Sequence, residues 1–304
     1  MLDFIHWVFS MSESRRLFCF GLGYTGLALA RGLIADGWTV AGTCRETERR
    51  DVLAAEGIDA WLFDESHPLD DASAALAGTT HLLAAAPPVE NGDGAAFLHG
   101  GAIAASETLE WIGYLSTTGV YGDRQGGWVD EDSPLNPSSA RAERRVAAEE
   151  QWLDFWWNDG IPTQVFRLAG IYGPGRGPLA ALRAGAAKRI DKPGHLFSRI
   201  HLDDIVATLR ASMARPNGGR AYNVCDDEPA AQAEVIAYAS ELLGVEPPPL
   251  VAIEDAALSP LGLSFYADNK RVCNDRIKDE LGVVLAYPDY QSGLRALLEA
   301  GDTP

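Results

Sequence analysis

The sequence predicts an α/β fold in which a doubly wound parallel sheet carries a smaller C-terminal cap. Short apolar runs alternate with stretches of helical spacing over the first two thirds of the 304-residue chain. A glycine-rich turn follows the first apolar run, and proline-rich loops replace the alternation past about residue 178. Strands separated by helices require right-handed crossovers, which place helices on both faces of one parallel sheet.

Seven strands are expected, each a short apolar run that ends in polar or turn-forming residues. They cover residues 17–20, 39–43, 60–63, 81–86, 112–116, 163–168 and 221–225. Residues 24–35 should form the first helix, because Leu27, Leu33 and Ile34 share one face. The fourth strand should stop at the proline pair 87–88, since proline cannot donate to a strand ladder.

A phosphate-binding turn is expected between the first strand and the first helix. Gly21, Gly23 and Gly26 form a G-x-G-x-x-G pattern, which here follows a strand and opens a helix. The first glycine permits a tight turn, the second admits a pyrophosphate and the third lets helix and strand approach. Tyr24 and Thr25 complete the loop at the helix N-terminus. This context favours a Rossmann-like dinucleotide site over an ordinary glycine-rich turn.

The end of the second strand indicates which dinucleotide binds. An NAD site usually has an acidic residue there for the ribose 2′-hydroxyl, whereas residues 42–45 read Gly-Thr-Cys-Arg. The planar guanidinium of Arg45 suits a 2′-phosphate, so NADP(H) is favoured over NAD(H). The alternative is an exposed arginine without a ligand.

Two further positions are expected at the cofactor. Asp64 follows the third strand and should face the adenine, or else serve as a turn or cap residue. Ala85 follows the fourth strand and has the small side chain needed where the chain passes beneath the cofactor. Simple core packing is the alternative for Ala85.

The carboxyl end of the fifth strand is the expected reaction site. Ser116, Thr117 and Thr118 place three hydroxyls in a row there, and Tyr121 follows closely. Ligands bind at this edge of an open α/β sheet. The alternative use of the hydroxyls is to cap the next segment.

Together these motifs resemble the extended short-chain dehydrogenase/reductase family, which includes sugar-nucleotide epimerases and dehydratases. The resemblance covers roughly residues 15–300, and it rests also on Arg167 with the Ile-Tyr-Gly-Pro-Gly run at 171–175 and on His-Leu-Asp-Asp at 201–204. It implies that Thr117 polarises the substrate oxygen. It also implies a catalytic tyrosine at position 141 and a ribose-binding lysine at position 145.

Positions 141 and 145 depart from the family pattern, because both are arginine. Glu149 matches the glutamate that often follows the family lysine, which supports this register. The resemblance implies that Arg145 could still bind the nicotinamide ribose. Arg141 cannot replace the tyrosine as an acid or base, since a guanidinium does not titrate near neutral pH.

Other side chains are candidates for the missing proton donor, namely Tyr121, Tyr172 and His201. Packing of the two aromatic rings and a loop hydrogen bond for the histidine are the alternatives. We therefore expect an atypical, metal-free reductase or epimerase acting on a small polar or sugar-like substrate. A non-catalytic NADP(H)-binding sensor or regulatory protein is the competing class.

The chain is expected to divide into two parts. Residues 12–178 should form the Rossmann-like domain, to which residues 200–225 return, and residues 179–304 should form a smaller, mostly helical substrate-binding cap. Several cations lie in the expected substrate pocket: Arg176, Arg183, Lys188, Arg199 and Arg271. In a chain of net charge −18, this local excess suggests an anionic substrate, with a solvated face as the alternative for any one of them.

Composition sets further limits. A net charge of −18 argues against a nucleic-acid surface, which needs a basic stripe, and no run is long enough to span a membrane. The four cysteines lack metal-ligand spacing, so reduced thiols and a cytoplasmic protein are expected, and a homodimer is one expected assembly. Residues 1–10 are apolar but lack a signal peptide's leader and cleavage site. Met11 is a more natural start, and a short surface helix is the alternative.

Overall fold

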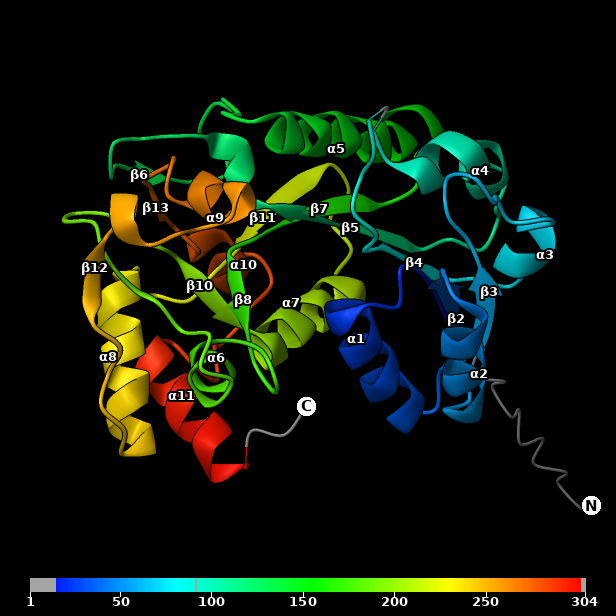
Figure 1. The fold of residues 1–304 in the computed structure, drawn as a ribbon. Helices are drawn as coiled ribbons and strands as arrows, with labels where there is room; N and C mark the ends of the chain where they lie inside the picture. The colour runs from blue at the N-terminus through cyan, green and yellow to red at the C-terminus, as the bar shows by residue number, and fades with distance from the viewer. Residues whose placement is uncertain (1–14, 91, 302–304) are drawn as a thin grey trace, which may run out of the picture.

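The computed structural model describes residues 15–90 and 92–301. The expectation for residues 1–10 therefore lies outside the described part of the chain. Figure 1 shows a central sheet with helices above and below it, and the cap to one side.

The main sheet contains seven strands. They are β1 (Arg16–Phe20), β2 (Thr39–Cys44), β3 (Asp59–Leu62), β4 (His81–Ala84), β5 (Trp111–Thr117), β7 (Thr163–Leu168) and β11 (Arg220–Val224). Their spatial order is β11-β7-β5-β4-β1-β2-β3, and every neighbouring pair is parallel. The chain runs outward from β1 to β3 and then returns to β4. The seven predicted strands and the doubly wound sheet are confirmed, and the switch point between β1 and β4 is where such sheets bind ligands.

Strand β4 ends two residues earlier than predicted, at Ala84. The amides of Ala85 and Ala86 both donate to the carbonyl of Phe20, at 2.8 and 3.0 Å. These two bonds turn the chain out of the regular ladder before it reaches the prolines, and they bring residues 85–86 against the turn that follows β1.

Helices cover both faces of the sheet (Figure 1). One face carries α1 (Tyr24–Ala35), α2 (Thr47–Ala55) and α7 (Leu202–Ala214), and the other carries α3 (Ala72–Leu76), α4 (Gly94–Ala104) and α5 (Ala140–Asp159). Successive strand residues point to opposite faces, so Leu17 and Cys19 enter one core while Phe18 and Phe20 enter the other.

The cap is built from short elements. Its helices are α6 (Pro178–Arg183), α8 (Gln232–Leu243), α9 (Pro260–Phe265) and α11 (Tyr290–Glu299), and its strands β9 (Arg189–Asp191) and β12 (Leu250–Ala252) form a parallel pair. A second pair joins β8 (Gly170–Tyr172) to β10 (Arg199–His201), and a third joins β6 (Trp128–Val129) to β13 (Arg271–Val272). These elements form a smaller part beside the main sheet, and the mostly helical substrate domain over residues 179–304 stays a prediction. Because β11 lies in the main sheet and α7 packs on α1, residues 200–225 contact the first domain, and the domain boundaries themselves stay a prediction.

Within residues 15–90 and 92–301, no helix has both the length and the apolar character that crossing a bilayer requires. The same residues contain no group of three or more His, Cys, Asp or Glu side chains arranged to hold a metal ion.

Candidate functional site

The turn between β1 and α1 has a shape that admits a ligand phosphate. Gly21 has a φ of +93°, and a Cβ there would lie 2.8 Å from the amide nitrogen of Ala86. A Cβ on Gly26 would lie 2.8 Å from the Cys19 sulfur. Gly23, in contrast, faces open space, with no described atom within 4 Å of an added Cβ. The fold itself requires Gly21 and Gly26, whereas the space beside Gly23 is suited to a ligand.

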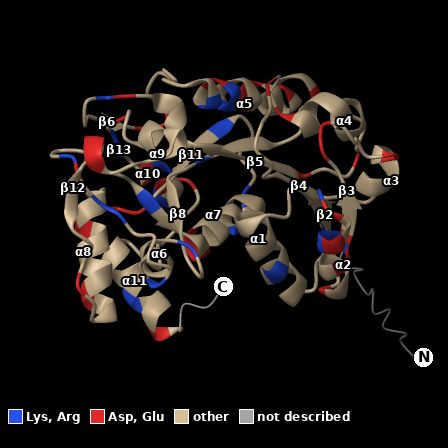
Figure 2. Ribbon diagram, viewed as in Figure 1, with Lys and Arg blue, Asp and Glu red and all other residues tan. Residues whose placement is uncertain are grey.

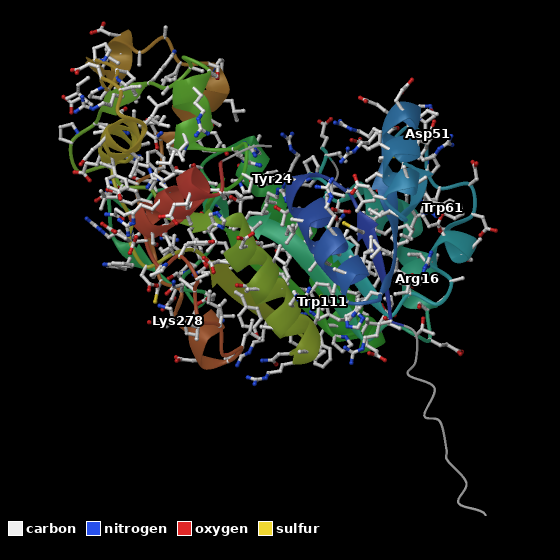
Figure 3. All side chains as sticks on the ribbon, turned by 90° about the horizontal axis from the view of Figure 1, so that it is seen from below. Arg16, Tyr24, Asp51, Trp61, Trp111 and Lys278 are labelled. Atoms are coloured by element: carbon white, nitrogen blue, oxygen red, sulfur yellow. The ribbon has the colours of Figure 1, made fainter. Side chains whose placement is uncertain are left out.

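Tyr24 joins this turn to the segment that follows β8. Its hydroxyl donates to the carbonyl of Pro174 at 3.0 Å, and the Arg176 guanidinium lies 5.3 Å from the centre of its ring. Figure 3 shows Tyr24 at the boundary between the sheet and the cap. Thr25 is buried beneath the turn. The contact therefore brings a cation, Arg176, to the edge of the predicted phosphate site.

Arginines gather after strand β2. Arg45 is exposed and makes no hydrogen bond or ion pair with the residues that the structure describes. Burial raises the pKa of the neighbouring Cys44 thiol, and the charges of Arg49 and Arg50 partly oppose that rise. Arg49 and Arg50 lie in the first half of α2, close to Arg45 in the chain.

Asp64 is engaged in a turn. Its carboxylate accepts from the amides of Ser66 and His67 at 2.7 and 2.9 Å and pairs with the His67 ring at 3.0 Å. The hydrogen bond from His67 is the main cause that lowers the pKa of Asp64. This geometry matches the turn role that was the alternative, and an adenine contact would have to share the same carboxylate.

Ala85 lies directly beneath the glycine turn. Its carbonyl carbon would be 3.2 Å from a Cβ on Gly21, and its own Cβ would be 3.8 Å from one on Gly26. A larger side chain at position 85 would press on the turn. The structure thus brings Ala85 together with the predicted phosphate loop.

The three hydroxyls at the end of β5 have different surroundings. Ser116 is buried and donates to Glu149 at 2.5 Å. Thr117 accepts from the amide of Gly119 at 3.1 Å, which caps the short 3-10 helix η1 (Thr118–Tyr121). Thr117 and Thr118 also border a cavity. Thr117 and Thr118 therefore border a ligand space, and the Ser116 hydroxyl is used within the core.

A buried polar network lies behind Thr117. Arg167 in β7 pairs with Glu149 in α5 at 2.8 Å, and both side chains are buried. Arg167 also donates to the Tyr121 hydroxyl at 2.9 Å, and Tyr121 donates to Asn223 at 2.7 Å. Burial raises the pKa of Tyr121 to about 12. Tyr121 does not border the cavity, so the structure places this candidate proton donor in the core, in line with the packing alternative.

Helix α5 brings both arginines of the altered motif to the same sheet edge. Arg145 donates to the carbonyl of Leu115 at 2.5 Å. Arg141 borders the cavity, and its guanidinium lies 5.8 Å from the centre of the Phe265 ring in α9. Arg141 is exposed, and partial desolvation, followed by repulsion from Arg145 and Arg144, lowers the pKa of its guanidinium. Figure 2 shows basic residues in the part of α5 that lies nearer the cap.

The cavity measures about 920 Å³ and lies between the carboxyl ends of β5 and β7 and the cap. Its two sides come from distant segments, with Thr117, Arg141 and Leu168 on the sheet side and Lys188, Arg199 and Phe265 on the cap side. This volume is within the range of small-molecule sites. Of the cations predicted for a substrate pocket, Lys188 and Arg199 border it, whereas Arg176, Arg183 and Arg271 do not.

The other candidate proton donors are placed differently from each other. Tyr172 borders the cavity, and burial raises its pKa. His201 does not border it; its Nδ1 accepts from the amide of Asp203 at 3.1 Å and so caps α7. Burial lowers the pKa of His201, so its ring stays neutral at neutral pH.

Lys270 is a cavity residue that sequence reasoning missed. Its ammonium donates to the carbonyl of Gly122 at 3.0 Å and pairs with Asp268 at 3.4 Å. Burial lowers the pKa of Lys270 below its usual value. A sequence signal existed, because Tyr266 and Lys270 have the Tyr-x-x-x-Lys spacing, but they lie in a turn and loop rather than on a helix.

Comparison with known proteins agrees with this arrangement. A family model described as the NAD dependent epimerase/dehydratase family matches residues 21–225. Protein YeeZ of Escherichia coli (strain K12) is 32% identical over 280 residues, which covers 88% of this chain and 95% of that protein. A 3-diazoavenalumate denitrifying reductase from a Streptomyces species is 30% identical over 182 residues, which covers 55% of this chain and 58% of that enzyme.

A solved structure agrees over nearly the whole chain. It is that of a functionally unknown conserved protein from Silicibacter pomeroyi DSS, which is 49% identical and superposes with a TM-score of 0.86. The superposition covers 95% of this chain and 100% of that chain. The glycine turn, the strand order and the matched residues together show that this chain belongs to the NAD-dependent epimerase/dehydratase family.

Proposed function

We propose that this protein is an NAD(P)(H)-dependent reductase that acts on a small anionic substrate, with NADP(H) favoured over NAD(H). The proposal rests on one observation: the glycine turn and the cavity lie at the same edge of the sheet. The glycine turn follows β1, and the cavity opens at the ends of β5 and β7. A dinucleotide bound across the switch point would reach from the glycine turn to the cavity.

The residues present fit such a cofactor. The open space beside Gly23 and the first amides of α1 suit a pyrophosphate, and Arg45 suits a 2′-phosphate. One guanidinium nitrogen of Arg145 donates to the Leu115 carbonyl and the Tyr114 hydroxyl, and we assign the remaining donors to the nicotinamide ribose. When bound, the nicotinamide supplies or accepts the hydride.

The chain's own side chains supply the remaining roles. Thr117 still has a hydroxyl hydrogen to donate, which we assign to the substrate oxygen. Lys270 borders the same cavity, and we assign it the proton that Arg141 cannot deliver. The cavity's other ammonium, Lys188, donates to the carbonyls of Ala256 and Ala257. Burial lowers the pKa of Lys270, which makes the ammonium a better acid near neutral pH.

Reduction suits this set of groups better than epimerisation. An epimerase first removes a proton from the substrate, which neither the Arg141 guanidinium nor the Lys270 ammonium can accept. A reductase needs the proton delivered once. The related Streptomyces protein is named a reductase, which supports the same choice.

Titration of the full-length chain with NADPH and NADH by ligand fluorescence tests the proposal. NADPH should bind at least about tenfold more tightly, because the charge-assisted contact of Arg45 with a phosphate is worth about 1.5–3 kcal/mol. Arg45→Glu should erase this preference, while Arg295→Glu, an equal change of charge on α11, should not.

Equal affinities for the two dinucleotides would contradict the NADP(H) assignment. Tight binding with no hydride transfer across a broad substrate screen would favour the competing class, a non-catalytic NADP(H)-binding sensor. The homodimer and the cytoplasmic location stay predictions, which light scattering and cell fractionation would test.

A further inference from the structure

We infer that the cavity accepts a carboxylic acid with an apolar, aromatic-sized body, and that Arg141 binds its carboxylate beside the reacting carbon. This inference deepens the proposed function and rests on it for the position of that carbon. Such a ligand differs from the polar or sugar-like substrate expected from the sequence.

The first support is the apolar character of the cavity wall. Phe197, Phe265, Ile236 and Leu258 from the cap border the space, opposite Leu168 from the sheet. Phe265 is 54% exposed although it lies against the cavity. A large aromatic surface left open towards a cavity gains most from contact with an apolar ligand.

The second support is that most polar groups of the wall are already paired. Lys188 donates to the carbonyls of Ala256 and Ala257 at 2.7 and 2.8 Å. Arg199 donates to two carbonyls at 2.9 Å and to Gln232 at 2.9 Å. The Ser259 hydroxyl accepts from a backbone amide at 3.1 Å. A sugar ring needs a partner for each of several hydroxyls, and this wall offers few unpaired groups.

The third support is the charge of Arg141. Among the four cations that border the cavity, Arg141 has no hydrogen bond to the described residues, whereas Lys188, Arg199 and Lys270 all donate to protein groups. Its contact is the face of Phe265, at 5.8 Å. Its planar fork is therefore available for a carboxylate.

The local field strengthens that assignment. Arg141, Arg144 and Arg145 lie in the first turns of the 20-residue helix α5, whose positive dipole end disfavours cations. Glu143 is the acid in that first turn. An anion in the cavity would relieve the repulsion among these arginines.

The placement also fixes which end of the ligand is charged. Arg141 and Thr117 border the same cavity, and α5 packs on the η1 turn that Thr117 caps. The carboxylate would thus lie near the substrate oxygen, with the apolar body directed towards Phe197 and Leu258. A sugar nucleotide carries its charge on a diphosphate instead, away from the reacting ring carbon.

Calorimetry on the full-length chain tests the inference with three probes. The probes are 3-phenylpropionate, its neutral amide 3-phenylpropanamide, and UDP-glucose. We expect 3-phenylpropionate to bind about tenfold or more tightly than the amide, since only the acid makes a charge-assisted bond. Arg141→Leu should remove that difference and Arg141→Lys should keep part of it. Arg144→Leu, the same change three residues on and outside the cavity wall, should alter affinity by less than about twofold.

Two outcomes would overturn the inference. One is equal binding of the acid and the amide to the unaltered chain, a result that needs no variant and so no check of folding. The other is preferred binding of UDP-glucose that Arg141→Leu leaves unchanged. These measurements use no dinucleotide, so a failure of the inference is separate from a failure of the NADPH titration, which tests the proposed function.

Discussion

At the scale of single residues, Asp226 is a buried carboxylate just after β11. Neither of its oxygens has a hydrogen-bond partner among the described residues. Burial raises the pKa of Asp226 to about 8, and the nearby charge of Arg199 only partly opposes the rise. The residue is therefore protonated at neutral pH in the folded state but ionised in the unfolded state.

This difference makes folding depend on pH. Between pH 4 and pH 8 the folded state binds the extra proton, so the free energy of unfolding should fall as pH rises and level off above pH 8. Asp226→Asn cannot ionise and should flatten the profile. Between pH 5 and pH 8, the free energy of unfolding of Asp226→Asn should fall by at least about 1 kcal/mol less than that of the unaltered chain, measured by urea unfolding. Parallel profiles would show that the carboxylate is solvated.

Lys270 gives a second prediction at this scale. A general acid works only while protonated, so kcat should be full below the pKa of Lys270 and fall as pH rises through it, at a pH below the usual lysine value. Lys270→Gln should lower kcat by about 10²–10⁴-fold and remove the alkaline fall, with NADPH affinity within about twofold. A variant that retained the same alkaline fall would exclude Lys270 as the proton source. Lys270→Arg, which keeps the charge but does not titrate, is the control.

At the scale of elements, the glycines of the β1–α1 turn have different roles. Gly26 is required by the packing of the fold, whereas Gly23 leaves space for the ligand. Gly26→Ala would bring its Cβ to 2.8 Å from the carbonyl oxygen of Gly21, and should lower the unfolding free energy by about 1–3 kcal/mol. Gly23→Ala meets open space at a φ of −85°, so stability should change by less than about 0.5 kcal/mol.

The same Gly23→Ala variant should bind NADPH at least about tenfold more weakly, because its methyl would occupy the space assigned to the pyrophosphate. Thermal melting and fluorescence titration measure the two effects separately. Unchanged NADPH affinity would place the dinucleotide elsewhere.

At the scale of the whole molecule, the Arg167–Glu149 pair links elements that are distant in the sequence. Through Ser116, Tyr121 and Asn223 the network connects α5, β5, β7 and β11. Asn223 then donates to the carbonyl of Cys273 at 3.1 Å, beside β13. The network therefore connects the main sheet by hydrogen bonds to the segment that contains Lys270.

Breaking this pair should destabilise the fold. Glu149→Gln leaves the buried Arg167 guanidinium without a counter-charge and should lower the unfolding free energy by about 3–5 kcal/mol. Glu150→Gln, the same change on an exposed neighbour in α5, should alter it by less than about 0.5 kcal/mol. Similar losses in the two variants would mean that water, rather than the ion pair, satisfies Arg167.

The sequence by itself determined the features that depend on neighbouring residues. Strands of four to seven residues follow from local apolar runs, and the roles of Gly21 and Gly26 follow from the demands of one tight turn. Arg141, Arg145 and Glu149 follow one another at four-residue intervals, so one face of helix α5 carries all three to the same sheet edge.

Only the tertiary structure decided which groups reach the cavity. Tyr121 has the expected spacing yet lies in the core, because Arg167 and Asn223 approach its hydroxyl from other strands. Lys270 reaches the reaction end through a contact with Gly122 across 148 residues of chain. Burial and charge at such contacts depend on how distant segments pack, and no local pattern of residues encodes that packing.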